Sequence, residues 1–554
     1  MRKYTILFLL LFVISGRSSA QVFEWARSGA SSVLATGSAI ATDGHGNIYA
    51  MGTFFGKQQF GSTALTAEAR DVYLVKYNPQ GKVLWAKHAG SSGDDFGNAI
   101  AVDKAGNCEI GGSFVGTMYL DGDTLISRGQ QDMFIARYNS NGKLLWAHSA
   151  GGANADHAMT MSLDEDGNTY IAGFFKDSIW FGADVMIGTK KNATFSVFLA
   201  KYDEDGKIEW AKETGGANYY SPGEGLQIAS DPDGDTYITG YFQTEANFDG
   251  EVIKNHGTFG LFIAKYNSSG KLKWVKSSSK DGSMIVGKAI ALDAKGNVYV
   301  TGTFTQTAVF DTITEVSKNL GNAEMFLAKY TSKGNIIWLR RTTGFGMKSP
   351  NAIAIDAEGN PIVAGMFHDT AIFGATTCSS DGSECFFIVK YSAKGDPVWA
   401  RQGGKHGKTF AKAIGIDRSG DVYMTGNYSD TADFGKARLK AAEQTQDAFF
   451  VKLSPRLVVS ETKLPDSITA DLQMLSCEVN GKFALVKFSM PRPAFVTLRL
   501  IDEVGDVAEA YIEGQREAGV YEEKIDLVGI VAGDYYCRLQ AGMDKATKKI
   551  TVRK

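Results

Sequence analysis

The stretch KAIALDAKGNVYVTGTF, residues 288–304, decides the fold because close copies of it return along the chain. Residues 98–107 read NAIAVDKAGN, and residues 351–360 read NAIAIDAEGN. Within the stretch, a polar turn that includes Asp293 and Gly296 separates two apolar runs whose length and composition are typical of strands. Self-similarity of this kind predicts a repeat architecture built from small β-units.

A tryptophan marks the end of each repeat. Tryptophans recur every 60 to 64 residues, and only Trp180 falls outside the series. The series is Trp25, Trp85, Trp146, Trp210, Trp274, Trp338 and Trp399. In the first full copy, four β-type runs read SAIAT, NIYAMGTF, VYLVKY and KVLWAKH. Four antiparallel strands per unit are typical of a propeller blade, and no helical periodicity competes with them.

The two ends of the repeat region predict how the ring closes. Residues 23–26 form a tryptophan-bearing run with no partners before it, whereas three runs near residue 450 lack a following tryptophan strand. Those runs are residues 413–417, 421–428 and 447–453. Pairing the first run with the last three completes a seventh blade and hides two strand edges that would otherwise promote aggregation. We therefore expect an all-β fold with a seven-bladed β-propeller over residues 21–455.

The pattern A-I-A-x-D-x-x-G-N-x-Y-x-T-G over residues 289–302 resembles the bacterial seven-bladed β-propeller repeat family. The resemblance covers about residues 21–455 and implies the propeller fold, but it implies little about a ligand. The second copy departs from the pattern at Cys108 and Glu109, and the sixth copy contains Pro361. We expect those blades to be locally irregular.

The first residues predict export. Arg2 and Lys3 precede the apolar run of residues 4–14 and a segment of mostly small residues that ends at Ala20. This order is typical of a secretory signal peptide, and the run is too short to span a bilayer as a helix. We expect residues 1–20 to be removed, the protein to pass through the periplasm to the outside or the outer cell surface, and no transmembrane segment to remain.

A different pattern follows the repeats. Residues 456–469 read as a polar linker, and residues 470–554 contain short strands that predict a small Ig-like β-sandwich. The stretches 494–507, 530–542 and 548–554 resemble type A sorting domains of the type IX secretion system, although the usual Pro-Asn-Pro opening is missing. The resemblance implies that the type IX machinery recognises this domain at the outer membrane, after which the body is released or anchored.

Composition argues against some partners. The 58 basic residues nearly balance the 61 acidic residues, which leaves no basic field of the kind that nucleic acids require. The five cysteines are an odd number, so at least one is free. Cys378 with Cys385, and Cys477 with Cys537, could form disulfides in an oxidising compartment.

One aspartate ends the inner strand of every copy. The series is Asp43, Asp103, Asp164, Asp231, Asp293, Asp356 and Asp417. We interpret each as the cap of its own turn, since such a carboxylate accepts from amides two or three residues on. A cation bound by the ring is the alternative, but the calcium-loop pattern has Phe175 or Phe242 where a glutamate is needed. No cofactor or metal is predicted, with calcium as the minority alternative.

The pattern N-x-x-G-K-x-x-W, as in residues 78–85, resembles the tryptophan-docking motif of quinone-carrying propellers. The indole of such a motif can pack on the neighbouring blade and donate its N–H to the backbone. Those enzymes have eight blades, and many have a vicinal cysteine pair, which this sequence lacks. Quinone chemistry is therefore not expected.

The inner strands contain no Arg, Glu or internal Asp, the histidines lack metal-ligand spacing, and no G-x-S-x-G motif occurs. The sequence therefore predicts no catalytic residues and favours a protein that is not an enzyme. Loops vary between copies on one face of the ring, where binding usually resides. The ligand-face candidates are His157, Tyr219, Tyr220, Phe345 and His406.

We expect a secreted or cell-surface binding or adhesion propeller for an unknown glycan or protein ligand. One alternative is a carbohydrate-active or other hydrolase whose catalytic residues lie on loops. The other alternative is a structural surface-layer component.

Overall fold

The computed structural model describes residues 19–183, 185–188, 195–215, 225–319, 321–443, 445–457, 472–480, 482–490, 492–502, 507–516, 519–527, 530–541 and 544–552. These residues form strands and turns, and none of them belongs to a helix long and apolar enough to cross a membrane. The chain divides into two compact units. Residues 21–456 form the larger unit, and the described residues from Leu457 onward belong to the other.

Strands of the larger unit pair antiparallel in groups of four, and each group is named here by its first strand. The β2 group consists of β2 (Leu34–Thr42), β3 (Ile48–Phe60), β4 (Thr63–Tyr77) and β5 (Val83–Gly90). The β6 group consists of β6 (Phe96–Val102), β7 (Cys108–Leu120), β8 (Asp123–Tyr138) and β9 (Leu144–Gly151). The β10 group consists of β10 (His157–Leu163), β11 (Thr169–Phe175), β14 (Ser196–Tyr202) and β15 (Ile208–Thr214).

The same order continues along the chain. The β16 group consists of β16 (Gln227–Ser230), β17 (Thr236–Phe242), β20 (Gly260–Tyr266) and β21 (Leu272–Ser278). The β22 group consists of β22 (Ile285–Leu292), β23 (Val298–Phe304), β26 (Glu324–Tyr330) and β27 (Ile336–Arg341). The β28 group consists of β28 (Lys348–Ile355), β29 (Pro361–Phe367), β32 (Cys385–Tyr391) and β33 (Pro397–Gly403).

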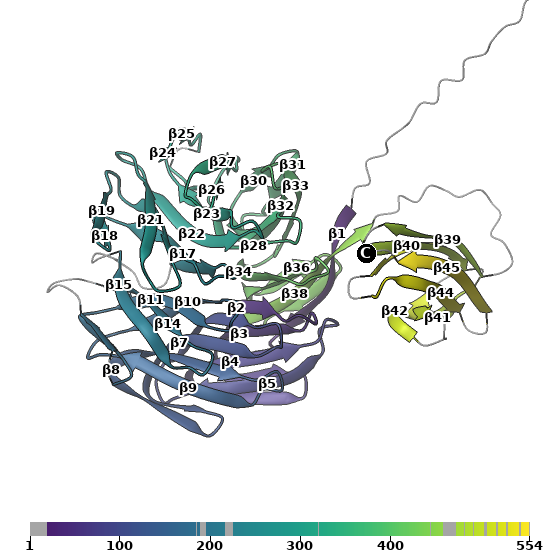
Figure 1. Cartoon of the computed structure of the whole chain (residues 1–554), viewed down its shortest axis with the longest axis horizontal. Coiled ribbons are helices and arrows are strands. Elements are labelled where there is room, and N and C mark those ends of the chain that lie inside the picture. Colours follow the sequence, from purple (N-terminus) through teal and green to yellow (C-terminus); the bar gives the residue numbers. More distant parts are fainter. Residues whose placement is uncertain are drawn as a thin grey trace, which may run out of the picture. The chain divides into compact units, whose positions relative to one another are not determined.

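The last group draws its strands from both ends of the unit. It contains β34 (Thr409–Ile416), β35 (Val422–Ser429) and β38 (Gln446–Leu457), and its fourth strand is β1 (Ser19–Ser28), which pairs with β38. The first strand of each group contacts the first strand of the next, and β34 contacts β2, so these contacts form a closed cycle. Figure 1 shows β2, β10, β22, β28 and β34 near the middle of this unit.

The stretch between the second and third strands varies between copies, and the sequence did not predict its structure. It forms a hairpin in every group, either as extensions of the long strands β3–β4 and β7–β8 or as a separate pair. The separate strands are β12 (Ser178–Phe181), β13 (Val185–Gly188), β18 (Glu245–Phe248), β19 (Glu251–Lys254), β24 (Thr307–Phe310), β25 (Ile313–Val316), β30 (Thr370–Phe373), β31 (Thr376–Ser379), β36 (Thr431–Phe434) and β37 (Ala437–Lys440). In their first strands, buried residues alternate with more exposed ones, and the closing phenylalanine is buried, so the hairpins cover the core.

The tryptophan strand of one group is fixed to the turn of the next. The Nε1–H of Trp274 donates to the carbonyl of Ser332 at 3.1 Å, and Gly334, with φ of +80°, lies against the same ring. A Cβ at Gly334 would approach the ring to 3.0 Å, so both the conformation and the contact require glycine. The same indole bond forms from Trp25, Trp85, Trp146, Trp210 and Trp338.

The expected irregularity of the second copy is absent. β7 pairs with β6 and β8 in the register that the other groups use. The register shift near the start of β6 also occurs in the first strand of the β22 group. Buried Glu109 is accommodated because Arg137 and Thr169 contact its carboxylate. Pro361 is also compatible, since it is the first residue of β29, a strand position that proline tolerates.

The smaller unit contains two sheets with a common apolar core. β39 (Gln473–Asn480), β40 (Phe483–Met490) and β43 (Gly519–Asp526) form one sheet. β42 (Val507–Arg516), β41 (Ala494–Asp502), β44 (Gly533–Ala541) and β45 (Asp544–Val552) form the other. Val486, Phe488, Leu498 and Leu539 are among the buried residues that both sheets contribute to this core. The five cysteines are free thiols here, and Cys477 on one sheet hydrogen-bonds with Cys537 on the other.

Candidate functional site

A pocket of about 890 Å³ opens on the face where the inner strands begin. Its lining comes from three groups that meet there. They contribute the end of β35 and the start of β38, the start of β2 with the middle parts of β3 and β4, and the segment before β6. The lining residues are Val33, Leu34, Phe55, Glu68, Ala69, Arg70, Asp94, Ser429, Thr445 and Gln446. This face is opposite the Asp-x-x-Gly-Asn turns and carries the segments that vary between copies.

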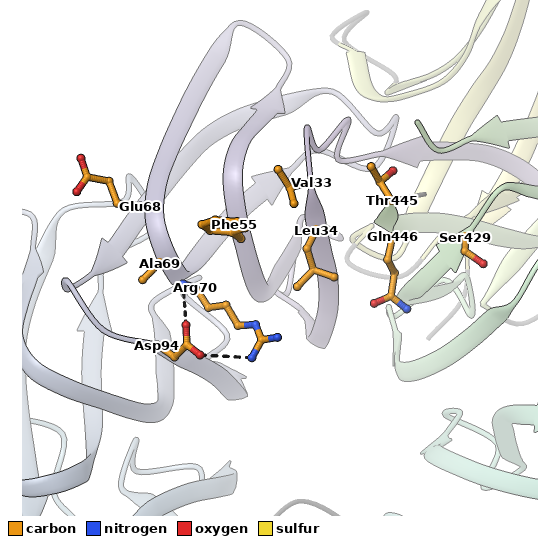
Figure 2. Close-up of a pocket in the computed structure, with 10 residues that line it drawn as sticks. All are labelled: Val33, Leu34, Phe55, Glu68, Ala69, Arg70, Asp94, Ser429, Thr445 and Gln446. Atoms are coloured by element: carbon orange, nitrogen blue, oxygen red, sulfur yellow. Dashed lines mark hydrogen bonds and ion pairs between the residues drawn. The ribbon is translucent and has the colours of Figure 1, made fainter. Parts of the chain in front are cut away.

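The pocket combines an apolar surface with hydrogen-bonding groups. Phe55 keeps 37% of its surface exposed although it lies on a strand of the core sheet, and neighbouring Val33 is 43% exposed. In Figure 2, Leu34 lies between Arg70 on one side and Gln446 on the other. An exposed aromatic ring beside amide, hydroxyl and ionic groups can bind a ligand that is partly apolar and partly hydrogen-bonding.

An ion pair forms one rim of the pocket. The backbone N–H of Arg70 donates to Oδ1 of Asp94 at 3.2 Å, and Arg70 Nη1 donates to Oδ2 at 3.4 Å, as Figure 2 shows. The guanidinium also lies 6.0 Å from the centre of the Phe96 ring. Since Arg70 and Asp94 belong to neighbouring groups, the pair holds the rim across the contact between them.

A second pocket of about 540 Å³ adjoins the first at Ser429. It uses the same repeat positions two groups away, in the β28 and β34 groups. Glu384 and Lys408 form an ion pair of 3.0 Å at the positions that Arg70 and Asp94 hold in the first pocket, so the charges are reversed. His368 takes the position of Phe55, directly after the aromatic residue that ends the second strand.

The sequence candidates are distributed around this face. His406 precedes two lining residues of the second pocket, and its backbone N–H donates to Asp381 Oδ2 at 3.1 Å. Hydrogen bonding from Ser383 lowers the pKa of Asp381 to about 2. Phe345 is 78% exposed, and its backbone N–H donates to Thr370 Oγ1 beside the turn that carries His368.

The remaining candidates do not line either pocket. His157 is half-buried on β10, with Nδ1 at 3.1 Å from Ser113 Oγ, and burial lowers its pKa. Tyr219 and Tyr220 lie outside the described residues. The structure therefore brings His406 and Phe345 near the second pocket and leaves His157 at a contact between two groups.

The repeated aspartates accept hydrogen bonds within their own turns. Asp43 Oδ1 accepts from the backbone N–H groups of His45 and Asn47 at 2.8 and 2.9 Å. Equivalent bonds reach Asp103, Asp164, Asp231, Asp293, Asp356 and Asp417. Asp43 also lies 3.7 Å from the ammonium of buried Lys76. Within the described ranges, no three His, Cys, Asp or Glu side chains are grouped so that they could hold a metal ion.

A model of the β-propeller repeat family matches residues 398–434. This segment is therefore a β-propeller repeat, and the all-β larger unit is propeller-like. An uncharacterized WD repeat-containing protein of Acanthamoeba polyphaga mimivirus is 25% identical over 445 residues, which are 65% of this chain and 31% of that protein. The chain thus spans about a third of this relative.

Two solved structures are similar at low sequence identity. One is a protein of unknown function from Bacteroides caccae, with a TM-score of 0.32 and 13% identity, covering 60% of this chain and 89% of that chain. The other is PorZ, an essential surface component of the type IX secretion system of Porphyromonas gingivalis. It has a TM-score of 0.21 and 10% identity, covering 96% of this chain and all of that chain.

Sequence reasoning missed the residues of the larger pocket, although the repeat contained a signal for some of them. Each second strand has a buried aromatic residue at the same repeat position, and the position after it differs in chemistry from copy to copy. That position holds Phe55, Val115, Lys176, Gln243, Thr305, His368 and Ser429. Three of these seven residues line the two pockets.

Proposed function

We propose that the protein is an exported binding or adhesion module whose seven-bladed propeller holds a ligand in the pocket around Phe55. The observation that supports this most directly is the pocket itself: an exposed aromatic ring beside an ion pair, an amide and hydroxyl groups. The closed cycle of contacts between first strands supports the count of seven blades. Such a ring is a rigid scaffold for a site made from variable positions.

The charges of the pocket favour an uncharged, polar ligand. Arg70 is paired with Asp94, and Lys408 in the adjoining pocket is paired with Glu384. Glu68 and Asp430 add negative charge to the two linings, which disfavours polyanions. Because the pockets adjoin at Ser429, an extended molecule could occupy both. We therefore propose a neutral oligosaccharide as the ligand, with the aromatic ring against a sugar face and the polar groups on its hydroxyls.

Replacing Phe55 by Ala, or Arg70 by Ala, is expected to weaken binding of a neutral glycan at least ~10-fold, because buried aromatic and Arg contacts dominate recognition. The ligand would first be found on an array of neutral and acidic glycans and matrix proteins, and affinities would then be measured by calorimetry. Tyr119→Ala and Arg438→Ala are matched controls, since both side chains are exposed on hairpins outside the pockets.

Other results would redirect the proposal. Binding that is unchanged in Phe55→Ala and Arg70→Ala would exclude this pocket as the site. Turnover of an array glycan would indicate a hydrolase, and concentration-dependent assembly without any ligand would indicate a surface-layer component. If the protein binds a matrix protein on the array but no glycan, the proposed ligand class would change and the proposed site would stay the same.

We further propose that the C-terminal unit is an Ig-like sorting domain read by the type IX secretion machinery. The two-sheet core gives this unit its own apolar interior, as a separately recognised domain needs. Removal of residues 470–554 is expected to leave the propeller in the periplasm of a bacterium that has this secretion system. Fractionation and surface labelling would check this, and an unchanged amount outside the cell would contradict it.

A further inference from the structure

Two neighbouring contacts between groups place an aspartate beside an aspartate. The backbone N–H of Asp95, just before β6, donates to the carbonyl of Arg70 at 2.6 Å, and Asp71 follows Arg70 on β4. One group further, the N–H of Asp156 donates to the carbonyl of Gln131 at 2.6 Å, and Asp132 follows on β8. We call these the first and second acid pairs.

Other contacts between groups fill the same two positions differently. Glu324 and Lys348 carry opposite charges there, Cys385 and Thr409 are neutral, and so are Gly260 and Ile285. The repeat fold therefore does not require two acids at these positions. Their presence at two successive contacts needs a separate physical explanation.

All four carboxyl groups are buried and incompletely bonded. Asp95, Asp132 and Asp156 have no exposed surface, and Asp71 is 3% exposed. Each has one oxygen without a hydrogen-bond partner: Asp71 Oδ1, Asp95 Oδ2, Asp132 Oδ1 and Asp156 Oδ1. Two ionised carboxylates side by side in such surroundings would be strongly unfavourable, because burial and like charge both oppose ionisation.

The other oxygens have partners that fix the side chains. In the first pair, Asp95 Oδ1 accepts from Ser91 Oγ and from the Val115 N–H, both at 3.1 Å. Asp71 Oδ2 lies 2.5 Å from His88 Nε2 on β5, and this histidine is the nearest basic group. The exposed ion pair of Arg70 and Asp94 lies next to the first acid pair, since these residues directly precede Asp71 and Asp95 in the sequence.

The second pair has no such histidine. Asp156 Oδ2 accepts from the Gly152 N–H at 2.7 Å, and Asp132 Oδ2 accepts from the Arg128 N–H at 2.9 Å. Burial raises the pKa of both Asp132 and Asp156; the Arg128 guanidinium opposes the rise at Asp132, and nearby Asp177 adds to the rise at Asp156. Among these charged neighbours, none neutralises Asp156.

We propose that each acid pair is a proton-binding site, in which the two neighbouring carboxyl groups together hold one proton that is released as the pH rises. A proton on one carboxyl group removes one of the two like charges and gives that group a hydrogen-bond donor, which an ionised carboxylate lacks. The fold supplies the oxygens, and water supplies and takes up the proton. Loss of the proton leaves two negative charges at the contact and weakens it.

The direction of the titration follows from burial. Burial raises the pKa of Asp95 from 3.8 to about 7 and that of Asp156 to about 8, and the partner aspartates add to both shifts. Burial also raises the pKa of Asp132 to about 6. Between the unfolded value and these folded values, the native state binds more protons than the unfolded state. The stability that the acid pairs contribute is therefore greatest at acidic pH and falls as the pH rises toward 8.

The melting temperature of the full chain is expected to fall by roughly 5 °C between pH 5 and pH 8.5. In the double variant Asp95→Asn and Asp156→Asn, more than half of this fall should disappear, because neutral amides cannot lose the shared protons. Asp94→Asn is the matched control, since that neighbouring side chain is half exposed, and it should keep the fall. An equal fall in the double variant would overturn the proposal.

Infrared difference spectra of the unaltered protein keep the test decisive if the double variant does not fold. The C=O band of protonated carboxylic acids should be present at pH 6.5 and absent at pH 9, and it should persist in Glu109→Gln, which removes another buried carboxyl group whose pKa burial raises to about 7. A missing band at pH 6.5 would overturn the proposal. Calcium chloride at pH 8.5 gives a second check. If it raises the melting temperature of the unaltered protein and a chelator reverses the rise, the proposal is also overturned, since the pairs would then hold a divalent cation.

Discussion

Removal of residues 21–28 is expected to lower the free energy of unfolding of the larger unit by more than about 5 kcal/mol. These residues form most of β1, the fourth strand of the β34 group. Trp25 is buried and donates to the Pro79 carbonyl at 3.1 Å, and Phe23 packs against Phe386 and Phe434. Loss of one buried aromatic side chain costs about 3–5 kcal/mol, and the deletion also exposes the edge of β38.

Urea unfolding followed by tryptophan fluorescence, with size-exclusion chromatography for aggregation, would measure this loss. A synthetic peptide of residues 21–30 added to the shortened protein should restore part of the stability. Trp180→Ala is the control, because Trp180 is 38% exposed on a hairpin and should change stability by less than about 1 kcal/mol. A shortened protein that unfolds at the same urea concentration would show that β1 does not hold the ring together.

The sequence predicted the strand order of the repeats because each turn has its own chemistry. Asp293 and Gly296 mark one turn and Gly334 another, and the structure places these residues in turns between paired strands. The stretch before Phe310 could not be assigned, since it varies between copies and is too short for a clear alternation. Its hairpin depends on the burial of Phe310 against Phe326, a contact between segments that local sequence does not reveal.

The pocket was harder to predict because its residues come from three groups. Val33 and Phe55 are far from Gln446 in sequence, and only ring closure brings them together. The variable loops indicated the face on which His406 and Phe345 lie, but they gave no indication of the strand residues Leu34 and Phe55 of the pocket. The sequence did contain one indication of the pocket: at Phe54 and Phe55, one repeat position stays aromatic while the next varies between copies.

Glu109 and Arg137 show how two departures from a repeat compensate each other. Five of the other six groups place a tyrosine and a lysine at these positions: Tyr49, for example, donates to the Gly106 carbonyl of the next group at 2.7 Å, with Lys76 over its ring. In the β6 group, Arg137 Nη1 donates to Glu109 at 2.7 Å and to the next group's Gly167 carbonyl at 3.4 Å. The arginine thus replaces both the lysine charge and the tyrosine hydroxyl.

Arg137→Met is expected to lower the free energy of unfolding by about 3–5 kcal/mol at pH 8, because Glu109, only 1% exposed, loses its counter-ion. Burial already raises the pKa of Glu109 to about 7, and removal of the guanidinium raises it further. The carboxyl group can then take up a proton, so the loss should be smaller at pH 6 than at pH 8. Urea unfolding of the full chain at both pH values would measure the difference.

A double variant separates the lost charge from lost packing. Glu109→Tyr with Arg137→Met places a neutral side chain where the carboxylate was, and Glu109→Tyr with Arg137→Lys rebuilds the pair of the other groups. The second double variant should return to within about 1 kcal/mol of the unaltered protein, since Asp103 still faces the cation as Asp43 faces Lys76. Arg438→Met, which breaks an exposed pair, should cost less than about 1 kcal/mol. If Arg137→Met lowers the free energy of unfolding equally at both pH values, and if adding Glu109→Tyr does not reduce this loss, then the arginine acts by packing alone.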